Sequence, residues 1–599
     1  MLLYTIRRIA SRSSSYFLLP LRGVTASVGG SGLKEFLNHA DMPHSKPPNV
    51  LVFTGEDPSC PHPLYNAVKQ TLDMCVNPDT YTVYMLSERQ INTTPWLQNT
   101  RVLIVACTEP SYTASRIFLE YYLRGGRLLV VSSKIRFPGI RFEEPLSELQ
   151  PVTVRCRNFT SASIMHGRIR YGLDDNVRGT SLAEDDRGQP VLYEVRCNSS
   201  KGVLILSQVH LEVDPLYFST SEATFSKLKQ SNEARISMLR YLLSTRLKVN
   251  CEPKPSYSLT VGHLFAATQA ELSSLLLEIQ SHCKNNEIVT EGTTFRYVLT
   301  DPITDVRATE CFLPICASPT NQMRHISSFN HQAYFDMLQT TSLGRAVLFV
   351  ENATTTMQTI KGLQNAHGSL AVATRQLQGK GRSGNAWLGP AGCAMFTVCV
   401  HISLRSLLGS RSSFIQHLAA LAITKAVRSA KGYELVNVRI KWPNDIYYGS
   451  HSKIGGILVS STLNRNEMCC YIGCGINVSN SQPTVCINDV AKVVAENRHM
   501  PAPQQLLPEE VVARTLNELE LLIAHFQSGQ ISSVLQDYYR FWLHSGQTVT
   551  LQSLGCKAVI KGLDEYGYLV AESMGKEYKL QPDGNSFDLM NNLIIMKPT

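Results

Sequence analysis

Short apolar runs alternate with segments of helical periodicity along most of the chain. Between residues 49 and 215, the runs NVLVFT, YTVYML, RVLIVA and RLLVVSS have the pattern of buried strands. The segments HPLYNAVKQTLDMCV and TASRIFLEYYLRGG lie between them and carry apolar residues at helical spacing. Strands that alternate with helices are typical of a parallel sheet covered by helices. We therefore predict a parallel α/β domain over 49–215.

The pattern changes twice after this domain. A Ser- and Asn-containing stretch over 216–325 predicts a mainly helical linker region, and a second α/β unit follows over 326–545. The last segment, 546–599, has short apolar runs separated by turn residues, such as Tyr566-Gly567. Short strands with frequent turns are typical of a small β-barrel. The sequence thus predicts an α/β (α+β) multidomain protein.

Composition places the chain among globular proteins. It has 599 residues, 43% of them hydrophobic, and a mean hydropathy of −0.08. No apolar run reaches the roughly 18 residues that a membrane-spanning helix needs, so we expect no membrane span. The sixteen cysteines include no CxxC pair, and several lie inside apolar runs. This favours reduced, buried thiols over a disulfide framework.

The N-terminal segment 1–48 has its own composition. It is rich in arginine and serine and contains no acidic residue before Glu35. This composition is typical of a mitochondrial transit peptide, and the alternative is a disordered basic tail. Because several cations lie here, the net charge of +9 is weak evidence for nucleic-acid binding. We see no zinc-finger spacing and expect that no nucleic acid is required.

The stretch QGKGRSGNAWLGPAG, residues 378–392, places two cations among closely spaced glycines. Its GxGxxG spacing is not a dinucleotide fingerprint, because Pro390 breaks the helix that should follow and no acid occurs from Asn352 to Tyr433. That range instead contains nine cations. Lys380 and Arg382 in a glycine loop are suited to an anion, and Trp387 is suited to an aromatic ring. A solvated turn is the alternative.

Three more motifs follow in order. They are KWPND at 441–445, KIGG at 453–456 and GCGIN at 473–477. Pro443 and the residues after it predict a turn at a strand end, and Gly455-Gly456 lets the backbone approach a ligand closely.

These motifs, in this order over about 335–599, resemble the signatures of the biotin protein ligases, also called holocarboxylase synthetases: GRGRxxxxW, KWPND, the KxxG lysine and GxGxN. Lys380 departs from the arginine of bacterial members, which keeps the charge but loses the bidentate fork. The resemblance implies a class II synthetase-like mixed α/β catalytic domain over 326–545 and an SH3-like β-barrel over 546–599.

The family reaction has two steps. Biotin and ATP give biotinyl-5′-AMP and pyrophosphate, and a lysine of an apo-carboxylase then takes the biotin. The resemblance implies Lys453 and Arg382 as catalytic residues. It implies a biotin site of Thr355, Thr356, Arg375, Gln376, Lys380, Lys453, Gly455 and Gly456. The implied nucleotide site comprises Gly379, Lys380, Gly381, Arg382, Trp387, Asn444 and Asn477.

By the same resemblance we expect ATP and Mg²⁺ as cofactors, with no metal ligands assigned. The expected partners are the biotin-acceptor domains of acetyl-CoA, propionyl-CoA, methylcrotonyl-CoA and pyruvate carboxylases. We expect the cytoplasm and the mitochondrion as locations and a monomer or dimer. A lipoate–protein ligase of the same fold is the nearest alternative, although its RRxxGGGxVxH-like stretch is missing.

The domain at 49–215 resembles the glutamine-amidotransferase-like domain of some eukaryotic biotin ligases. Ser132 or Ser133 stands near the position of the nucleophilic cysteine, and His210 and Glu212 resemble the usual His-x-Glu partners. An unactivated serine is a poorer nucleophile than a thiolate, so we interpret this domain as a degenerate scaffold. Amidotransferase-like activity of this domain is the second alternative. Cys107 lacks the glycine turn, and we expect it to be structural.

Overall fold

The computed structural model describes residues 47–596 with short gaps. The gaps are 57–61, 94–95, 98, 144–148, 157–158, 160, 176, 197–200, 219, 253–256, 300–305, 319–327, 365, 383–384, 552–553, 583–584 and 589–592. The described residues divide into two compact units, which separate between Lys254 and Pro255. The transit peptide predicted over 1–48 lies outside the described residues except for its last two residues. No described helix is both long and apolar enough to cross a membrane.

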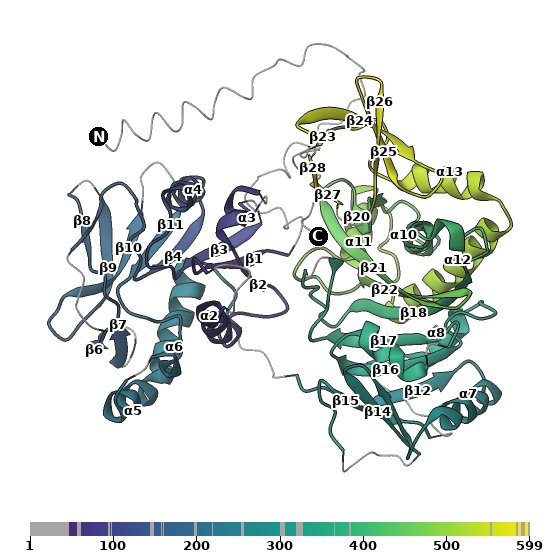
Figure 1. Ribbon diagram of the computed structural model, residues 1–599, viewed down its shortest axis with the longest axis horizontal. Coiled ribbons are helices and arrows are strands. Elements are labelled where there is room, and N and C mark those ends of the chain that lie inside the picture. Colours follow the sequence, from purple (N-terminus) through teal and green to yellow (C-terminus); the bar gives the residue numbers. More distant parts are fainter. Residues whose placement is uncertain are drawn as a thin grey trace. The chain divides into compact units, whose positions relative to one another are not determined.

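The first unit is a seven-stranded sheet in the order β2-β1-β3-β4-β11-β10-β9 (Figure 1). Its parallel strands are β2 (Thr82–Met85), β1 (Asn49–Phe53), β3 (Thr100–Val105), β4 (Arg127–Val131) and β11 (Val203–Ser207). The helices of this unit are α2 (Pro63–Asp73), α3 (Glu88–Thr93), α4 (Tyr112–Leu123), α5 (Glu222–Gln230) and α6 (Asn232–Tyr241). Two separate strand pairs are β5 (Ile140–Phe142) with β8 (Tyr171–Leu173), and β6 (Gln150–Val154) with β7 (Ala162–His166).

The prediction of a wholly parallel sheet is wrong at one edge. Strands β10 (Pro190–Arg196) and β9 (Arg178–Glu184) run antiparallel to their neighbours. Only a short connection separates β10 from β11, and parallel pairing needs a crossover of about a dozen residues or more. The connection therefore permits antiparallel pairing alone.

The second unit is built on an eleven-stranded sheet in the order β13-β14-β15-β12-β16-β17-β18-β22-β21-β20-β19 (Figure 1). In that order the strands are Glu287–Thr290, Thr293–Val298, Phe312–Cys316, Gly262–Ala266, Ala346–Ala353, Leu370–Gln376, Cys393–Ser403, Glu467–Asn477, Ser452–Asn464, Asp445–Tyr448 and Val438–Lys441. The helices are α7 (Gln269–His282), α8 (His331–Met337), α9 (Thr356–Thr359), α10 (Phe414–Arg428), α11 (Ile487–Asn497), α12 (Pro508–Gln527) and α13 (Ile531–Phe541), with the 3₁₀ turn η5 (Ile360–Leu363) after α9.

The prediction of a mainly helical linker over 216–325 is wrong. Helices α5 and α6 belong to the first unit, and residues 262–316 supply four strands of the large sheet around α7. Strand β12 pairs antiparallel with β16 from Gly262↔Val350 to Ala266↔Ala346. The strands at 262–316 are only four to six residues long, so their alternation is too brief to outweigh the helical periodicity of α7.

Alternation along the strands gives the large sheet two apolar faces. Phe396, Val398 and Val400 of β18 join the core under α10 and α12. The intervening Cys399 joins a separate core with residues of α7 and η5. A strand buried on both faces has no polar side to mark its orientation. The sequence therefore predicts β18 as a strand without telling which residues face which helices.

The segment 548–596 forms a six-stranded sheet in the order β26-β25-β24-β23-β28-β27. In that order the strands are Lys576–Leu580, Leu569–Ser573, Cys556–Leu563, Thr548–Leu551, Leu593–Met596 and Asn585–Asp588. The small all-β segment is as expected, while its assignment as an SH3-like barrel stays a prediction.

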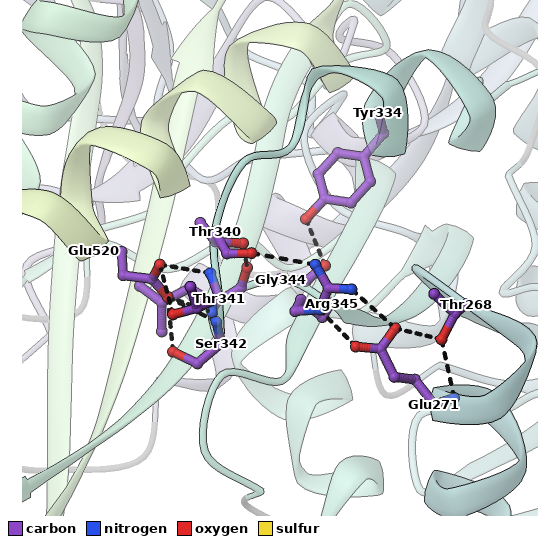
Figure 2. Close-up of polar contacts among 10 residues, drawn as sticks. Thr268, Glu271, Tyr334, Thr340, Thr341, Ser342, Gly344, Arg345 and Glu520 are labelled. Atoms are coloured by element: carbon purple, nitrogen blue, oxygen red, sulfur yellow. Dashed lines mark hydrogen bonds and ion pairs between the residues drawn. The ribbon is translucent and has the colours of Figure 1, made fainter.

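A polar network joins the segment mispredicted as a linker to the rest of the second unit (Figure 2). Glu520 of α12 accepts hydrogen bonds from the backbone N–H groups of Thr341, Ser342 and Leu343 at 2.7–3.0 Å. On the other side of the same loop, Arg345 pairs with Glu271 of α7, with Nε 2.6 Å from Oε1. The loop is thus held from both sides by carboxylates. The hydrogen bond from Arg345 also holds the pKa of Glu271 below its ordinary value.

A truncation tests whether residues 255–325 belong to the second unit. We expect a fragment of residues 255–599 to unfold cooperatively, because it keeps every strand of the large sheet. A fragment of residues 326–599 lacks the strands at 262–316 and exposes the β16 edge and the core beneath α7. Its melting temperature, measured by circular dichroism, should be lower by about 10 °C or more. Equal melting temperatures for the two fragments would contradict this architecture.

Two buried histidines make the second unit sensitive to acid. Burial lowers the pKa of His417 and of His544 to about 4 each. Nε2 of His544 accepts a hydrogen bond from the Trp442 N–H at 3.0 Å, which only an unprotonated nitrogen can do. A histidine whose folded pKa is depressed contributes stability that is complete above its unfolded pKa of about 6.5. That stability is lost as the pH falls towards 4.

We therefore predict that lowering the pH from 7 to 5 reduces the free energy of unfolding by about 2 kcal/mol for each histidine. Urea unfolding followed by tryptophan fluorescence at the two pH values measures this change. The variant His544→Gln keeps an acceptor for Trp442 but does not titrate, so its loss between pH 7 and 5 should be smaller by about 2 kcal/mol. An unchanged pH dependence in this variant would refute the assignment.

Candidate active site

The candidate site lies where the adjacent strands β21 and β22 both carry glycine. Gly456 of β21 pairs with Gly475 of β22, and β22 pairs in turn with β18. The indole ring of Trp387 covers this glycine pair. A Cβ atom added to Gly475 would lie 2.6–2.7 Å from three ring atoms, closer than any real contact. A glycine at this position is therefore required for the tryptophan to lie flat against the sheet.

Trp387 is held from the glycine loop. The backbone N–H of Trp387 donates a hydrogen bond to the carbonyl of Gly379 at 2.8 Å. The backbone N–H of Gly381 donates to the carbonyl of Asn385 at 2.7 Å. These bonds close residues 379–387 into a hairpin-like loop. The indole nitrogen is buried and has no hydrogen-bond partner among the described residues. Buried donors are normally paired, so this group is a position where a ligand acceptor would be favoured.

Lys453 is fixed beside the tryptophan by a carboxylate. Its Nζ lies 2.6 Å from the Oδ1 atom of Asp445 and 5.5 Å from the centre of the Trp387 ring. The other carboxylate oxygen of Asp445 lies 3.4 Å from Nζ of Lys441, which is buried. One carboxylate thus lies between two ammonium groups. Because the side chains of Asp445 and Lys453 are 13% and 22% exposed, solvent screens their pairing only in part.

Asp445 therefore orients Lys453. Asp445 follows a turn that comes directly after β19, and Asn444 connects this turn to β21. The Asn444 side chain donates to the Ile457 carbonyl at 2.6 Å, and the Ile457 N–H donates back to the Asn444 carbonyl at 2.9 Å. The KWPND motif thus positions a carboxylate.

The two loop cations differ in their surroundings. Lys380 is exposed, and its backbone bridges to Ala386. Arg382 is half-buried and contacts the Asn444 side chain at 3.4 Å and the carbonyl of Pro582, which lies between β26 and β27. The loop therefore meets both the KWPND turn and the C-terminal sheet. Its residues 383–384 lie outside the described residues.

A second polar group lies where α9 meets the sheet. Thr356 donates from its backbone N–H to the side-chain oxygen of Gln376 at 2.9 Å, and Thr397 of β18 donates to the Thr356 hydroxyl at 2.8 Å. The structure thus brings the predicted Thr356 and Gln376 together. Thr397 was not predicted. It is buried within the apolar run CAMFTVCV of β18, and a lone hydroxyl residue in that run was the available signal.

Other predicted residues have structural partners of their own. Thr355 caps α9 by accepting from the Gln358 N–H at 3.0 Å. The Arg375 guanidinium lies 3.8 Å from the centre of the Tyr257 ring, a cation–π contact. Gly455 packs against Ile446 of β20, and a Cβ atom there would lie 3.0 Å from the Gly475 carbonyl. Of the glycine pair in KIGG, Gly456 is the one that lies towards Trp387 and Lys453.

The nucleotide contact implied for Asn477 stays a prediction, and the side chain already has partners within the protein. Its amide nitrogen donates to Thr484 and Val485, and its oxygen accepts from Asn480 and from the Cys393 thiol. These four bonds use the full capacity of a buried amide. A contact with adenine would require breaking one of them. In this structure Asn477 holds the turn at 480–485, in which the Thr484 hydroxyl lies 3.3 Å from the Lys453 carbonyl.

The residues present do not fit a protein-held magnesium ion. Mg²⁺ prefers carboxylate and carbonyl oxygens. Among the described contacts, Asp445 is the carboxylate paired with Lys453. One of its oxygens faces Lys453 and the other faces Lys441. A metal ion would have to displace the ammonium group of one of these lysines from Asp445. We therefore assign no magnesium ligand in the protein.

In the first unit, the predicted nucleophile position lies at a strained turn. Ser132 follows β4 with φ of 41°, a left-handed value that is rare for serine. The Nδ1 atom of His210 lies 2.8 Å from Oε1 of the buried Glu212. The structure thus shows a left-handed serine after β4 and a His210–Glu212 pair, while the likeness to an amidotransferase stays a prediction. Burial raises the pKa of the Cys107 thiol, which makes this residue a poor nucleophile.

Comparison with known proteins gives consistent matches. Residues 349–477 match the Biotin/lipoate A/B protein ligase family. The biotin–protein ligase of Homo sapiens is 36% identical over 92% of this chain and 78% of its own length. The biotin–protein ligase of Schizosaccharomyces pombe is 25% identical over 92% of this chain and 100% of its own. The structure of a biotin protein ligase from Aquifex aeolicus with biotin and ATP covers 39% of this chain and 94% of its own at 21% identity, with a TM-score of 0.31.

The contact between Trp387 and the glycine pair can be tested by adding single methyl groups. Gly475→Ala should displace the indole and lower the free energy of unfolding by about 1–3 kcal/mol, as overpacking does. Gly456→Ala is the matched control, because its Cβ atom would make ordinary contacts of 3.4–3.5 Å. Its effect should stay below about 1 kcal/mol.

The readouts are urea unfolding and the tryptophan emission spectrum, with Trp387→Phe defining the contribution of this residue. In the Gly475→Ala variant, the emission of Trp387 should shift to longer wavelength, because the displaced indole is more exposed to water. An unshifted spectrum, or equal effects of the two glycine substitutions, would contradict the described packing.

Proposed function

The chain belongs to the biotin–protein ligase family, and we propose that the site around Lys453 carries out the two-step ligase reaction of that family. In the first step, a carboxylate oxygen of biotin attacks the α-phosphorus of ATP, and pyrophosphate leaves with the electron pair of the broken P–O bond. In the second step, the amine of an acceptor lysine attacks the acyl carbon of biotinyl-5′-AMP. An amide forms, AMP leaves, and the amine loses its proton to solvent or a base.

The observation that carries this proposal is the Lys453–Asp445 pair beside Trp387. Both substrates of the first step are anions, so their approach is opposed by charge repulsion. A lysine that is already oriented by a partly buried carboxylate reduces this repulsion without reorganising during the reaction. We propose that Nζ of Lys453 lies between the biotin carboxylate and the α-phosphate.

The glycine loop supplies the second part of the proposal. Lys380 and Arg382 are the cations that can contact the nucleotide phosphates, and the Trp387 indole can stack on an aromatic base. The mixed anhydride is destroyed by water, so a loop closed over it protects the intermediate. The contact of Arg382 with Pro582 supports a role for the C-terminal sheet in holding this loop closed.

For biotin we propose the polar group at α9, because biotin is largely apolar with one ureido group. The hydroxyls of Thr356 and Thr397 and the amide of Gln376 can contact that group, and Gly473 lets Met357 and Thr397 lie close to the strand beside them. A Cβ atom at Gly473 would lie 3.0 Å from the Met357 methyl group and 3.4 Å from Thr397 Oγ1. The burial of Thr356 and Thr397 supports a specific pocket over a surface contact.

We further propose the acceptors and locations. Apo-carboxylase domains of the acetyl-CoA, propionyl-CoA, methylcrotonyl-CoA and pyruvate carboxylase type are the expected acceptors. The basic N-terminus is expected to direct part of the protein to mitochondria, with the rest in the cytoplasm. Magnesium is expected to enter bound to the ATP phosphates, since the residues around Lys453 offer it no carboxylate of its own.

The proposal is tested by transfer of labelled biotin to an apo biotin-carrier domain, with ATP and magnesium present. An apo lipoyl domain with labelled lipoate runs in parallel. We expect transfer of biotin alone. Transfer of lipoate instead would assign the chain to the lipoate branch of the matched family.

The variant Lys453→Ala should reduce the rate of biotin-dependent pyrophosphate–ATP exchange about a hundredfold to a thousandfold. Exchange reports the first step without an acceptor, so a defect in acceptor binding does not affect it. Lys453→Arg keeps the charge and should lose less activity than the alanine variant. A Lys453→Ala enzyme with wild-type exchange would remove this lysine from the mechanism.

A further inference from the structure

A cluster of soft metal ligands lies on β18 and β22, the strands that also carry Thr397 and Gly475. Cys399 and His401 are two residues apart on β18 and therefore face the same side of the sheet. Cys469 of β22 pairs directly with His401. One ligand atom from each of these three residues lies within 4.8 Å of the others. The two sulfur atoms are 3.3 Å apart.

Packing alone does not account for this arrangement. Cys399 is completely buried and Cys469 is 8% exposed, as small apolar side chains of a core would be. The imidazole of His401 is one-third exposed, yet it converges on the two thiols. A histidine directed at a pair of cysteines contributes little apolar burial but completes a set of three ligands.

The distances suit a tetrahedral ion. Zn–S bonds of about 2.3 Å and Zn–N bonds of about 2.0 Å place the ligand atoms of one ion roughly 3.5–3.8 Å apart. The sulfur atoms would need to separate by only about half an ångström from their present spacing. His401 is also 3.7 Å from a carboxylate oxygen of Glu467, which is exposed. This carboxylate or a water molecule can take the fourth position.

We propose that Cys399, His401 and Cys469 form a binding site for a soft divalent cation, with zinc as the best match to two thiolates and one imidazole. Binding joins β18 to β22 at the ends of the strands farther from Gly475 and Asn477. Thr397 lies on the same face of β18, two residues or about 7 Å from Cys399. The ion would therefore fix the strands that also carry the proposed biotin contacts.

Cobalt(II) is a suitable probe, because a tetrahedral site with thiolates gives it intense visible bands and a sulfur-to-metal charge-transfer band. The full-length chain, stripped with a chelator and kept in a phosphine reductant, is titrated with CoCl₂. We expect one equivalent to bind and to be displaced by ZnCl₂. Zinc should also raise the melting temperature of the chain.

Cys469→Ser should weaken cobalt binding at least about a hundredfold, since even residues outside the ligand shell affect metal affinity about 10- to 100-fold. The matched control is Cys470→Ser, which changes the next residue on the opposite face of β22 and should bind as the wild type does. His401→Gln changes a partly exposed side chain and should weaken binding without unfolding the protein. It therefore keeps the test valid if either serine variant fails to fold.

Several results would overturn the proposal. These are the absence of tetrahedral bands in the reduced wild-type chain, wild-type binding by folded Cys469→Ser or His401→Gln, and equal loss of binding by a folded Cys470→Ser. A zinc-induced rise in melting temperature that persists in His401→Gln would also contradict it.

Discussion

The ion pair between Lys453 and Asp445 is the interaction on which the proposed chemistry depends. A lysine near a sheet surface can adopt many rotamers, and ordering it during a reaction has an entropic cost. Here the carboxylate holds Nζ at 2.6 Å and is itself held between two lysines. The geometry that the first step needs is therefore present before a substrate binds.

The remainder of the site is arranged around this pair by strand register. The pairing of Gly456 with Gly475 removes two side chains at one place on the sheet, and Trp387 fills the resulting space. The same pairing carries Asn477 to the turn at 480–485, where Thr484 reaches the backbone of Lys453. A shift of one residue would turn these side chains to the other face of the sheet. The register is thus part of the site.

Much of this arrangement could be predicted from sequence. The apolar runs located the parallel strands of the first unit, and the motifs located the loop cations and Lys453. The strands at 262–316 were missed because they are short, and they join the large sheet through β12, which pairs with β16 some 80 residues later. The contacts of Asn477 with the turn at 480–485 were not predicted, because a motif identifies a residue type but not its hydrogen-bond partners. Thr397 and the role of Asp445 needed the fold for the same reason.

The most direct test of the Lys453–Asp445 pairing is a double-mutant cycle on biotin-dependent pyrophosphate–ATP exchange. It compares Lys453→Ala, Asp445→Asn and the double variant with the wild-type chain. If Asp445 acts by orienting Lys453, the double variant should be about as slow as Lys453→Ala alone, because the carboxylate then has no lysine to orient. If the two defects multiply in full, Asp445 acts independently of Lys453 and the central claim is wrong.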